Sequence, residues 1–86
     1  MYNIQISPVA LRFLERLEKS NKNISQRLVR VIDSLKTNPS MGKKLFGGLA
    51  GFRSLRVGEY RIIYLIIEKM VLIQVVKIAH RREVYR

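Results

Sequence analysis

The chain has 86 residues, enough for one domain with a modest core and too few for a second domain. It has no cysteine and a single histidine, so the composition argues against redox and metal chemistry, and we expect no metal and no cofactor. Lysine and arginine number 17 against 6 acidic residues, and the net charge of +11 favours a nucleic acid or an acidic protein as partner.

The N-terminal part of the chain predicts one strand and then two helices. Residues 2–6 alternate apolar and polar side chains, as in a half-buried strand. Ser7-Pro8 is typical of an N-cap and a first helical position, and apolar residues recur at helical spacing over residues 10–19. A second helical stripe covers residues 24–37 after a polar break at residues 21–23, so we expect an antiparallel helical hairpin.

The second half of the chain predicts an antiparallel meander. Residues 40–51 hold four of the five glycines and are typical of a surface loop. Gly58-Glu59 suits a two-residue hairpin turn in which glycine supplies a positive φ. Strands are expected over residues 52–57, 60–68 and 71–78.

The last two expected strands are apolar on successive residues, so both of their faces must be covered. The helices can cover one face, and the other needs a curved sheet or a bound partner. The order of elements predicts a single α+β domain over residues 1–86, with an N-terminal strand and an antiparallel helical hairpin packed on an antiparallel meander sheet. We expect a cytoplasmic protein without membrane binding, because no signal peptide, bilayer-length apolar run or basic amphipathic helix with an aromatic face is visible.

Basic residues concentrate in the C-terminal half, where they suggest an anion site. Residues 43–86 carry ten basic and three acidic side chains. Strand alternation places Ser54 and Arg56 on one face, and Arg61 lies just past the turn, so Arg56 and Arg61 are expected near one another. A shared anion would relieve their repulsion, unless one of the three nearby glutamates pairs with either arginine.

Two side chains near the C-terminus are candidate proton carriers. His80 precedes Arg81 and Arg82, and an imidazole can act as acid or base near neutral pH. The guanidinium groups around Tyr85 would favour its anion, and its ring could instead stack on a nucleobase or cap the core. The alternative for His80 is an incidental exposed histidine.

Four further cations are candidate RNA phosphate contacts. Lys43 and Lys44 lie in the glycine-rich segment, Arg53 begins the basic segment of residues 53–61, and Arg82 lies in the basic segment of residues 80–85. A solvated charge pair is the alternative for the two lysines.

The segments LRVGEYRIIY (residues 55–64) and HRREVY (residues 80–85) resemble the RelE/ParE superfamily of toxins from type II toxin–antitoxin systems, and the resemblance covers essentially the whole chain. Similarity to the RelE branch implies an mRNA interferase, an endoribonuclease that inhibits translation by cutting mRNA in the ribosomal A site. The implied partners are the ribosome, mRNA and an acidic antitoxin, with a toxin–antitoxin hetero-oligomer left as an option. ParE-like relatives inhibit DNA gyrase instead, and a non-catalytic basic RNA-binding module is a third hypothesis.

The same resemblance implies roles for individual residues. Arg61 and Arg81 would hold the phosphate, with Arg56 as a weaker match, and Tyr85 would stack on or deprotonate the nucleotide. Ser54 stands where a second cation is expected, which leaves Tyr85 and His80 as rival bases. The presence of Tyr85 favours the RelE branch over the ParE branch.

Overall fold

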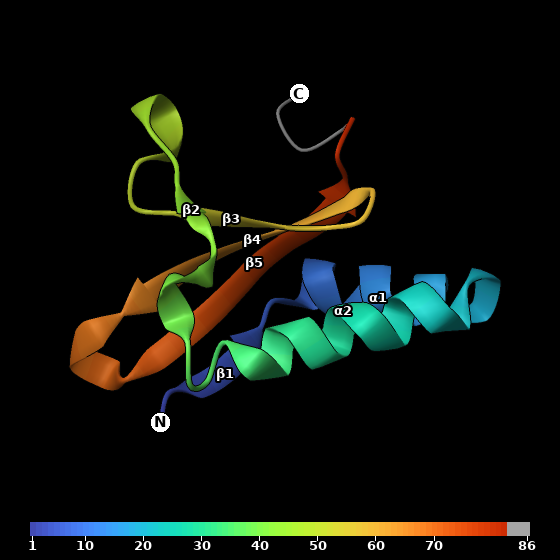
Figure 1. Ribbon diagram of the computed structural model, residues 1–86, viewed down its shortest axis with the longest axis horizontal. Helices are drawn as coiled ribbons and strands as arrows, with labels where there is room; N and C mark the ends of the chain where they lie inside the picture. The colour runs from blue at the N-terminus through green and yellow to red at the C-terminus, as the bar shows by residue number, and fades with distance from the viewer. Residues whose placement is uncertain (83–86) are drawn as a thin grey trace.

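The computed structural model describes residues 1–82 and places two helices against one face of a five-stranded sheet (Figure 1). The elements are β1 (Asn3–Ile6), α1 (Pro8–Ser20), α2 (Lys22–Ser34), η1 (Pro39–Met41), β2 (Lys43–Lys44), η2 (Gly47–Leu49), β3 (Arg53–Val57), β4 (Tyr60–Ile67), η3 (Glu68–Met70) and β5 (Leu72–His80). The strand order is β1-β5-β4-β3-β2, which confirms the predicted α+β architecture. The sheet is mixed, because β1 runs parallel to β5 while the remaining pairs are antiparallel.

The helical hairpin forms where the capping residues predict it. The Ser7 hydroxyl accepts a hydrogen bond from the Ala10 amide at 3.1 Å, and Pro8 occupies the first turn. Asn21 ends α1 and also caps α2, because its side chain accepts from the Ile24 amide at 3.3 Å. A single residue therefore joins the helices, and neither helix in the described part of the chain has the length and apolar character needed to cross a bilayer.

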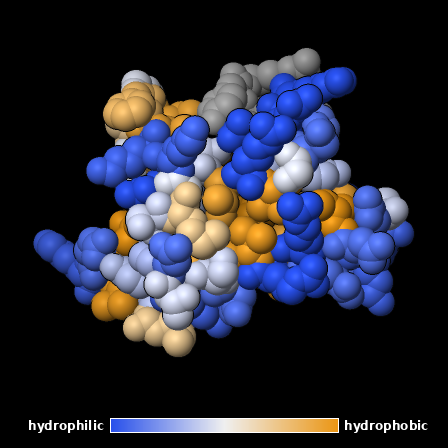
Figure 2. Space-filling model, viewed as in Figure 1, coloured by the Kyte–Doolittle hydropathy of each residue, from blue (hydrophilic) through white to orange (hydrophobic). Residues whose placement is uncertain are grey.

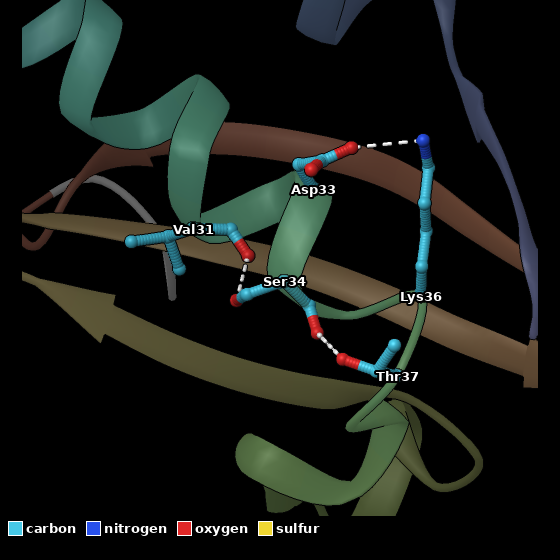
Figure 3. Close-up of polar contacts among 5 residues, drawn as sticks. All are labelled: Val31, Asp33, Ser34, Lys36 and Thr37. Atoms are coloured by element: carbon cyan, nitrogen blue, oxygen red, sulfur yellow. Dashed lines mark hydrogen bonds and ion pairs between the residues drawn. The ribbon is translucent and has the colours of Figure 1, made fainter.

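Polar side chains form hydrogen bonds and an ion pair at the C-terminal end of α2 (Figure 3). The Ser34 hydroxyl donates to the Val31 carbonyl at 2.6 Å, and the Thr37 hydroxyl donates to the Ser34 carbonyl at 3.3 Å. Lys36 forms an ion pair with Asp33 at 2.8 Å. The two hydroxyl contacts satisfy carbonyl groups that the end of a helix leaves without partners. The helix α2 ends at Ser34, slightly before the predicted boundary.

Apolar side chains form one cluster on each face of the sheet. The core between sheet and helices contains Ala10, Leu14, Leu17, Leu28, Ile32, Leu35, Val57, Ile62, Tyr64, Ile73, Val75 and Ile78. On the opposite face, which we call the open face, Leu45, Phe52 and Val76 pack against Ile63 and Ala79. A register shift opposite Ile63 leaves Val76 without a cross-strand partner and lets it join this second cluster. The segment between β2 and β3 thus covers part of the second apolar face.

The prediction of a surface loop over residues 40–51 was partly wrong. Lys43 and Lys44 form the edge strand β2, which pairs with β3, and two short 3-10 turns flank it. In Figure 1 this segment rises from the sheet away from the helices. Pairing with β3 satisfies backbone groups of the segment, and the glycine-rich local sequence contains no signal for that long-range contact.

Candidate functional site

Arg56 and Arg61 face each other across β3 and β4, as the sequence predicts. Their strand neighbours Val57 and Tyr60 pack with the helix-side core, so alternation puts both arginines on the open face. The Arg56 Nε donates to the Gly58 carbonyl at 3.1 Å. Within residues 1–82 no carboxylate oxygen lies within 4.0 Å of either guanidinium. Like charges placed directly opposite destabilise a sheet, and an anion bound between them would remove that cost.

A groove of about 510 Å³ lies over these arginines. Four of its eight lining residues are cationic, so the groove is strongly positive at neutral pH and suited to a phosphate backbone. Its walls and floor are formed by Met41, Lys43, Lys44, Leu45, Ser54, Leu55, Arg56 and Arg61. The structure therefore brings two of the predicted phosphate contacts, the paired lysines, beside the arginine pair.

Polar contacts from Tyr64 and Arg53 hold the lysine wall of this groove. The Tyr64 hydroxyl donates to the Pro39 carbonyl at 2.7 Å and accepts from the Gly42 amide at 2.8 Å. Burial raises the pKa of Tyr64, and the Gly42 bond and the nearby Arg53 charge offset part of that rise. Arg53 donates to the Gly42 carbonyl at 2.7 Å and the Ser40 carbonyl at 3.4 Å. Arg53 is one of the predicted phosphate contacts, and in this structure its guanidinium binds the segment that carries the two lysines.

Arg81 reaches the same end of the sheet but is paired with an acid. Its Nε lies 2.9 Å from a carboxylate oxygen of Glu59, and its amide donates to the Glu59 carbonyl at 2.8 Å. Glu59 therefore partners Arg81 rather than Arg56 or Arg61. Both side chains are exposed, and exposed pairs of this kind contribute about 0–1 kcal/mol, so a phosphate can compete for Arg81.

His80 is not brought together with the arginine pair. Its ring packs edge-to-face against Tyr60 with a centroid separation of 5.6 Å, and Tyr60 packs in the same way against Phe13 of α1 at 5.9 Å. The three rings line a hollow of about 260 Å³ on the helix side of the sheet. The predicted strand stopped at residue 78, whereas β5 continues to His80, and alternation then turns the imidazole away from Arg61.

The remaining predicted contacts lie at the end of the described chain. Arg82 is exposed, and its amide donates to Nδ1 of His80 at 3.3 Å. Tyr85 lies outside the described residues. Residues 1–82 contain no group of three or more histidine or carboxylate side chains that could hold a metal ion.

One aromatic side chain near the groove was not singled out from the sequence. Phe46 follows Leu45, which lines the groove, and is 84% exposed; exposed rings near cations are typical platforms for base stacking. The sequence signal that could have identified Phe46 is an aromatic residue within a short segment that has two lysines before it and two glycines after it. Figure 2 shows hydrophilic residues over most of this side of the molecule, around an apolar patch near its centre.

Comparison with known proteins gives consistent matches over nearly the whole chain. A family model described as the ParE toxin of the type II toxin–antitoxin system parDE matches residues 4–85. Toxin RelE of Mycobacterium tuberculosis is 34% identical over 86 residues, which is 99% of this chain and 87% of that protein. The toxin–antitoxin complex RelBE2 from Mycobacterium tuberculosis superposes with a TM-score of 0.83 at 29% identity, covering 93% of this chain and 98% of that chain. The intact Escherichia coli RelBE complex shares the fold at a TM-score of 0.77 and 16% identity, covering 93% and 96% of the two chains.

Proposed function

Because this chain belongs to the ParE toxin family of type II toxin–antitoxin systems, within the RelE/ParE superfamily, we propose that it is a ribosome-dependent mRNA endonuclease. The observation that carries the proposal is the arginine pair of the open face, Arg56 and Arg61, which lines a cationic groove and has no carboxylate partner within residues 1–82. The 34% identity to a protein named Toxin RelE supports the RelE branch.

The proposed reaction is an intramolecular phosphoryl transfer within the mRNA. The 2′-hydroxyl oxygen bonds to the adjacent phosphorus and the bond from phosphorus to the 5′-oxygen breaks, leaving a 2′,3′-cyclic phosphate and a 5′-hydroxyl. A base takes the proton of the 2′-hydroxyl, and an acid gives a proton to the leaving 5′-oxygen. Arg56 and Arg61 hold the phosphate oxygens and stabilise the charge that develops on them, and Arg81 joins them when it leaves Glu59.

Tyr85 is our candidate for the base. His80, its rival in the sequence, lies on the helix side of the sheet against Tyr60, whereas Arg61 lies on the open face. Tyr85 lies outside the described residues, so its role is carried by the sequence resemblance. We expect Tyr85→Phe to lower the rate of mRNA cleavage strongly and His80→Gln to leave it close to the wild-type rate. Both variants can be measured by in vitro translation with purified ribosomes.

In vitro translation with purified ribosomes tests the proposal. The wild-type protein should cut mRNA in the ribosomal A site, and Arg61→Ala should lower the cleavage rate roughly 100-fold or more, as for removal of one group that stabilises a transition state. Arg12→Ala is the matched control, because Arg12 is an exposed arginine of α1 on the helix side of the sheet. Absence of cleavage by the folded wild-type protein would refute the proposal.

Inhibition of DNA gyrase is the second candidate function. It is favoured by one observation, the match of residues 4–85 to the ParE toxin family. Under this alternative, expression should produce linear DNA breaks and a DNA-damage response while mRNA stays intact. A basic module without catalysis would instead bind RNA with steep salt dependence and cut neither nucleic acid.

We also propose that an acidic antitoxin neutralises this protein in the cytoplasm and forms a hetero-oligomer with it. The net charge of +11 favours an acidic partner, and the similar RelBE2 structure is a toxin–antitoxin complex. Co-expression with a small acidic protein from a neighbouring reading frame should restore growth and yield one complex in size-exclusion chromatography. Persistent growth arrest with no complex would exclude that protein as the antitoxin.

A further inference from the structure

Ser54 carries a buried hydroxyl that has no hydrogen-bond partner within residues 1–82. The residue is 4% exposed, in the middle of β3. The other buried serine, Ser25, is equally buried at 4%, but its hydroxyl donates to the Leu14 carbonyl at 3.3 Å. A buried hydroxyl without a partner has lost water and gained nothing in return, so its presence calls for an explanation.

The position of Ser54 supplies that explanation. It lies on the open face, between Lys43 of β2 and Ile63 of β4, and it lines the cationic groove. The arginine pair is the next residue pair along β3 on the same face, roughly 7 Å away at the usual rise of a strand. The hydroxyl is therefore the neutral donor within a group of four cations.

We propose that Ser54 is a substrate-binding residue whose hydroxyl donates a hydrogen bond to a phosphate oxygen of the RNA strand in the groove. This inference rests on the proposed function and adds to it a neutral donor where the RelE resemblance expects a cation. A hydrogen bond from a hydroxyl to a charged phosphate is stronger than one between neutral groups, so it can offset the cost of burying the hydroxyl in the free protein.

Access to Ser54 requires movement of the side chains around it. Lys43 and Lys44 line the same groove, are exposed, and make no side-chain hydrogen bond or ion pair within residues 1–82. Lys43 lies directly opposite Ser54, and both flexible lysine side chains can turn toward an arriving phosphate. Substrate binding then gives the Ser54 hydroxyl the partner that it does not have in the free protein.

The consequence is an opposite effect of one substitution on stability and on binding. Ser54→Ala removes a hydroxyl without a partner, so the free protein should unfold at the same temperature as wild type or at a higher one. Ser25→Ala removes a satisfied hydroxyl of equal burial and should lower the unfolding temperature. The two variants should have the opposite ranking in RNA affinity: Ser54→Ala should weaken RNA binding, and Ser25→Ala should leave RNA binding unchanged.

The test measures thermal unfolding, RNA affinity and ribosomal cleavage on the same variants. The binding probe is a short RNA with a 2′-deoxy sugar at the cleavage position, which can be bound but not cut. Ser54→Ala should bind it about tenfold more weakly, the usual scale for one hydrogen bond to a charged group. Ser54→Thr should keep most of the affinity and Ser54→Val should lose it, because threonine and valine have the same shape and differ in the hydroxyl.

Unchanged RNA affinity in Ser54→Ala, equal affinities of Ser54→Thr and Ser54→Val, or a loss of stability in Ser54→Ala as large as that in Ser25→Ala would each overturn the inference. Its failure can be told from failure of the proposed function. If wild type cuts no mRNA while Ser54→Ala still weakens RNA binding, the endonuclease proposal fails and the Ser54 contact stands. If wild type and Ser54→Ala cut and bind equally, the Ser54 contact alone fails.

Discussion

Replacement of Tyr64 by phenylalanine tests whether one buried hydroxyl holds the lysine wall of the groove. Tyr64 is 0% exposed, and its hydroxyl joins β4 to the Pro39 carbonyl and the Gly42 amide at 2.7 and 2.8 Å. Phenylalanine fills the same space without the oxygen, so the change removes both hydrogen bonds and little else. The segment that carries Lys43 and Lys44 then keeps the Arg53 contacts and the pairing of β2 with β3, but loses its anchor to β4.

The expected cost follows from those two bonds. Each contributes about 1 kcal/mol net, and a buried amide left without a partner adds a penalty, so Tyr64→Phe should lower the free energy of unfolding by about 2–4 kcal/mol. For a domain of this size the unfolding temperature should fall by roughly 10–20 °C. Exchange of the Gly42 amide hydrogen should accelerate more than that of amides in β5, because the loss of structure is local.

Urea and thermal unfolding measure the stability change, with Tyr60→Phe as the control. Tyr60 lies on the same strand and the same face, but its hydroxyl makes no hydrogen bond within residues 1–82, so its removal should cost less than about 0.5 kcal/mol. The reasoning is refuted if the two variants differ by less than about 0.5 kcal/mol in unfolding free energy. A loss of RNA affinity in Tyr64→Phe, with both lysines intact, would show that the anchor positions the wall.

Three further predictions follow from named contacts. Gly42→Ala should cost about 1–3 kcal/mol in urea unfolding, because the new Cβ would lie 2.8 Å from the Tyr64 hydroxyl and 3.1 Å from the Ser54 carbonyl; an unchanged midpoint would contradict this packing. Glu59→Gln should change stability by less than about 1 kcal/mol and raise RNA affinity up to about fivefold by releasing Arg81, and weaker binding would argue against a phosphate role for Arg81. Burial raises the pKa of Tyr64 above 10.0, so the stability that its neutral hydroxyl contributes is fully present below pH 10 and is lost as the pH rises through the raised pKa. Unfolding curves at increasing alkaline pH should therefore converge for wild type and Tyr64→Phe, and parallel curves would contradict the shift.

Local signals in the sequence predicted the helical hairpin and the meander. Ser7, Pro8 and Asn21 satisfy or replace backbone donors at helix ends within three residues of their own positions. Gly58 has the positive φ of 60° that its turn requires, and the strands on either side pair in the register that places Arg56 opposite Arg61. These features depend on neighbours that are close in the chain, so a sequence pattern is sufficient to find them.

The sequence by itself determined the α+β class, the order of its elements and the cationic character of one strand pair. Only the tertiary structure decided that β1 lies parallel to β5, that β2 forms an edge strand, that Glu59 pairs with Arg81, and that the Ser54 hydroxyl is buried without a partner. It also decided that His80 faces the helices, because two additional residues of β5 set its direction. Each of these outcomes depends on contacts between segments distant in sequence, and such contacts form only when the whole chain buries its apolar surface together.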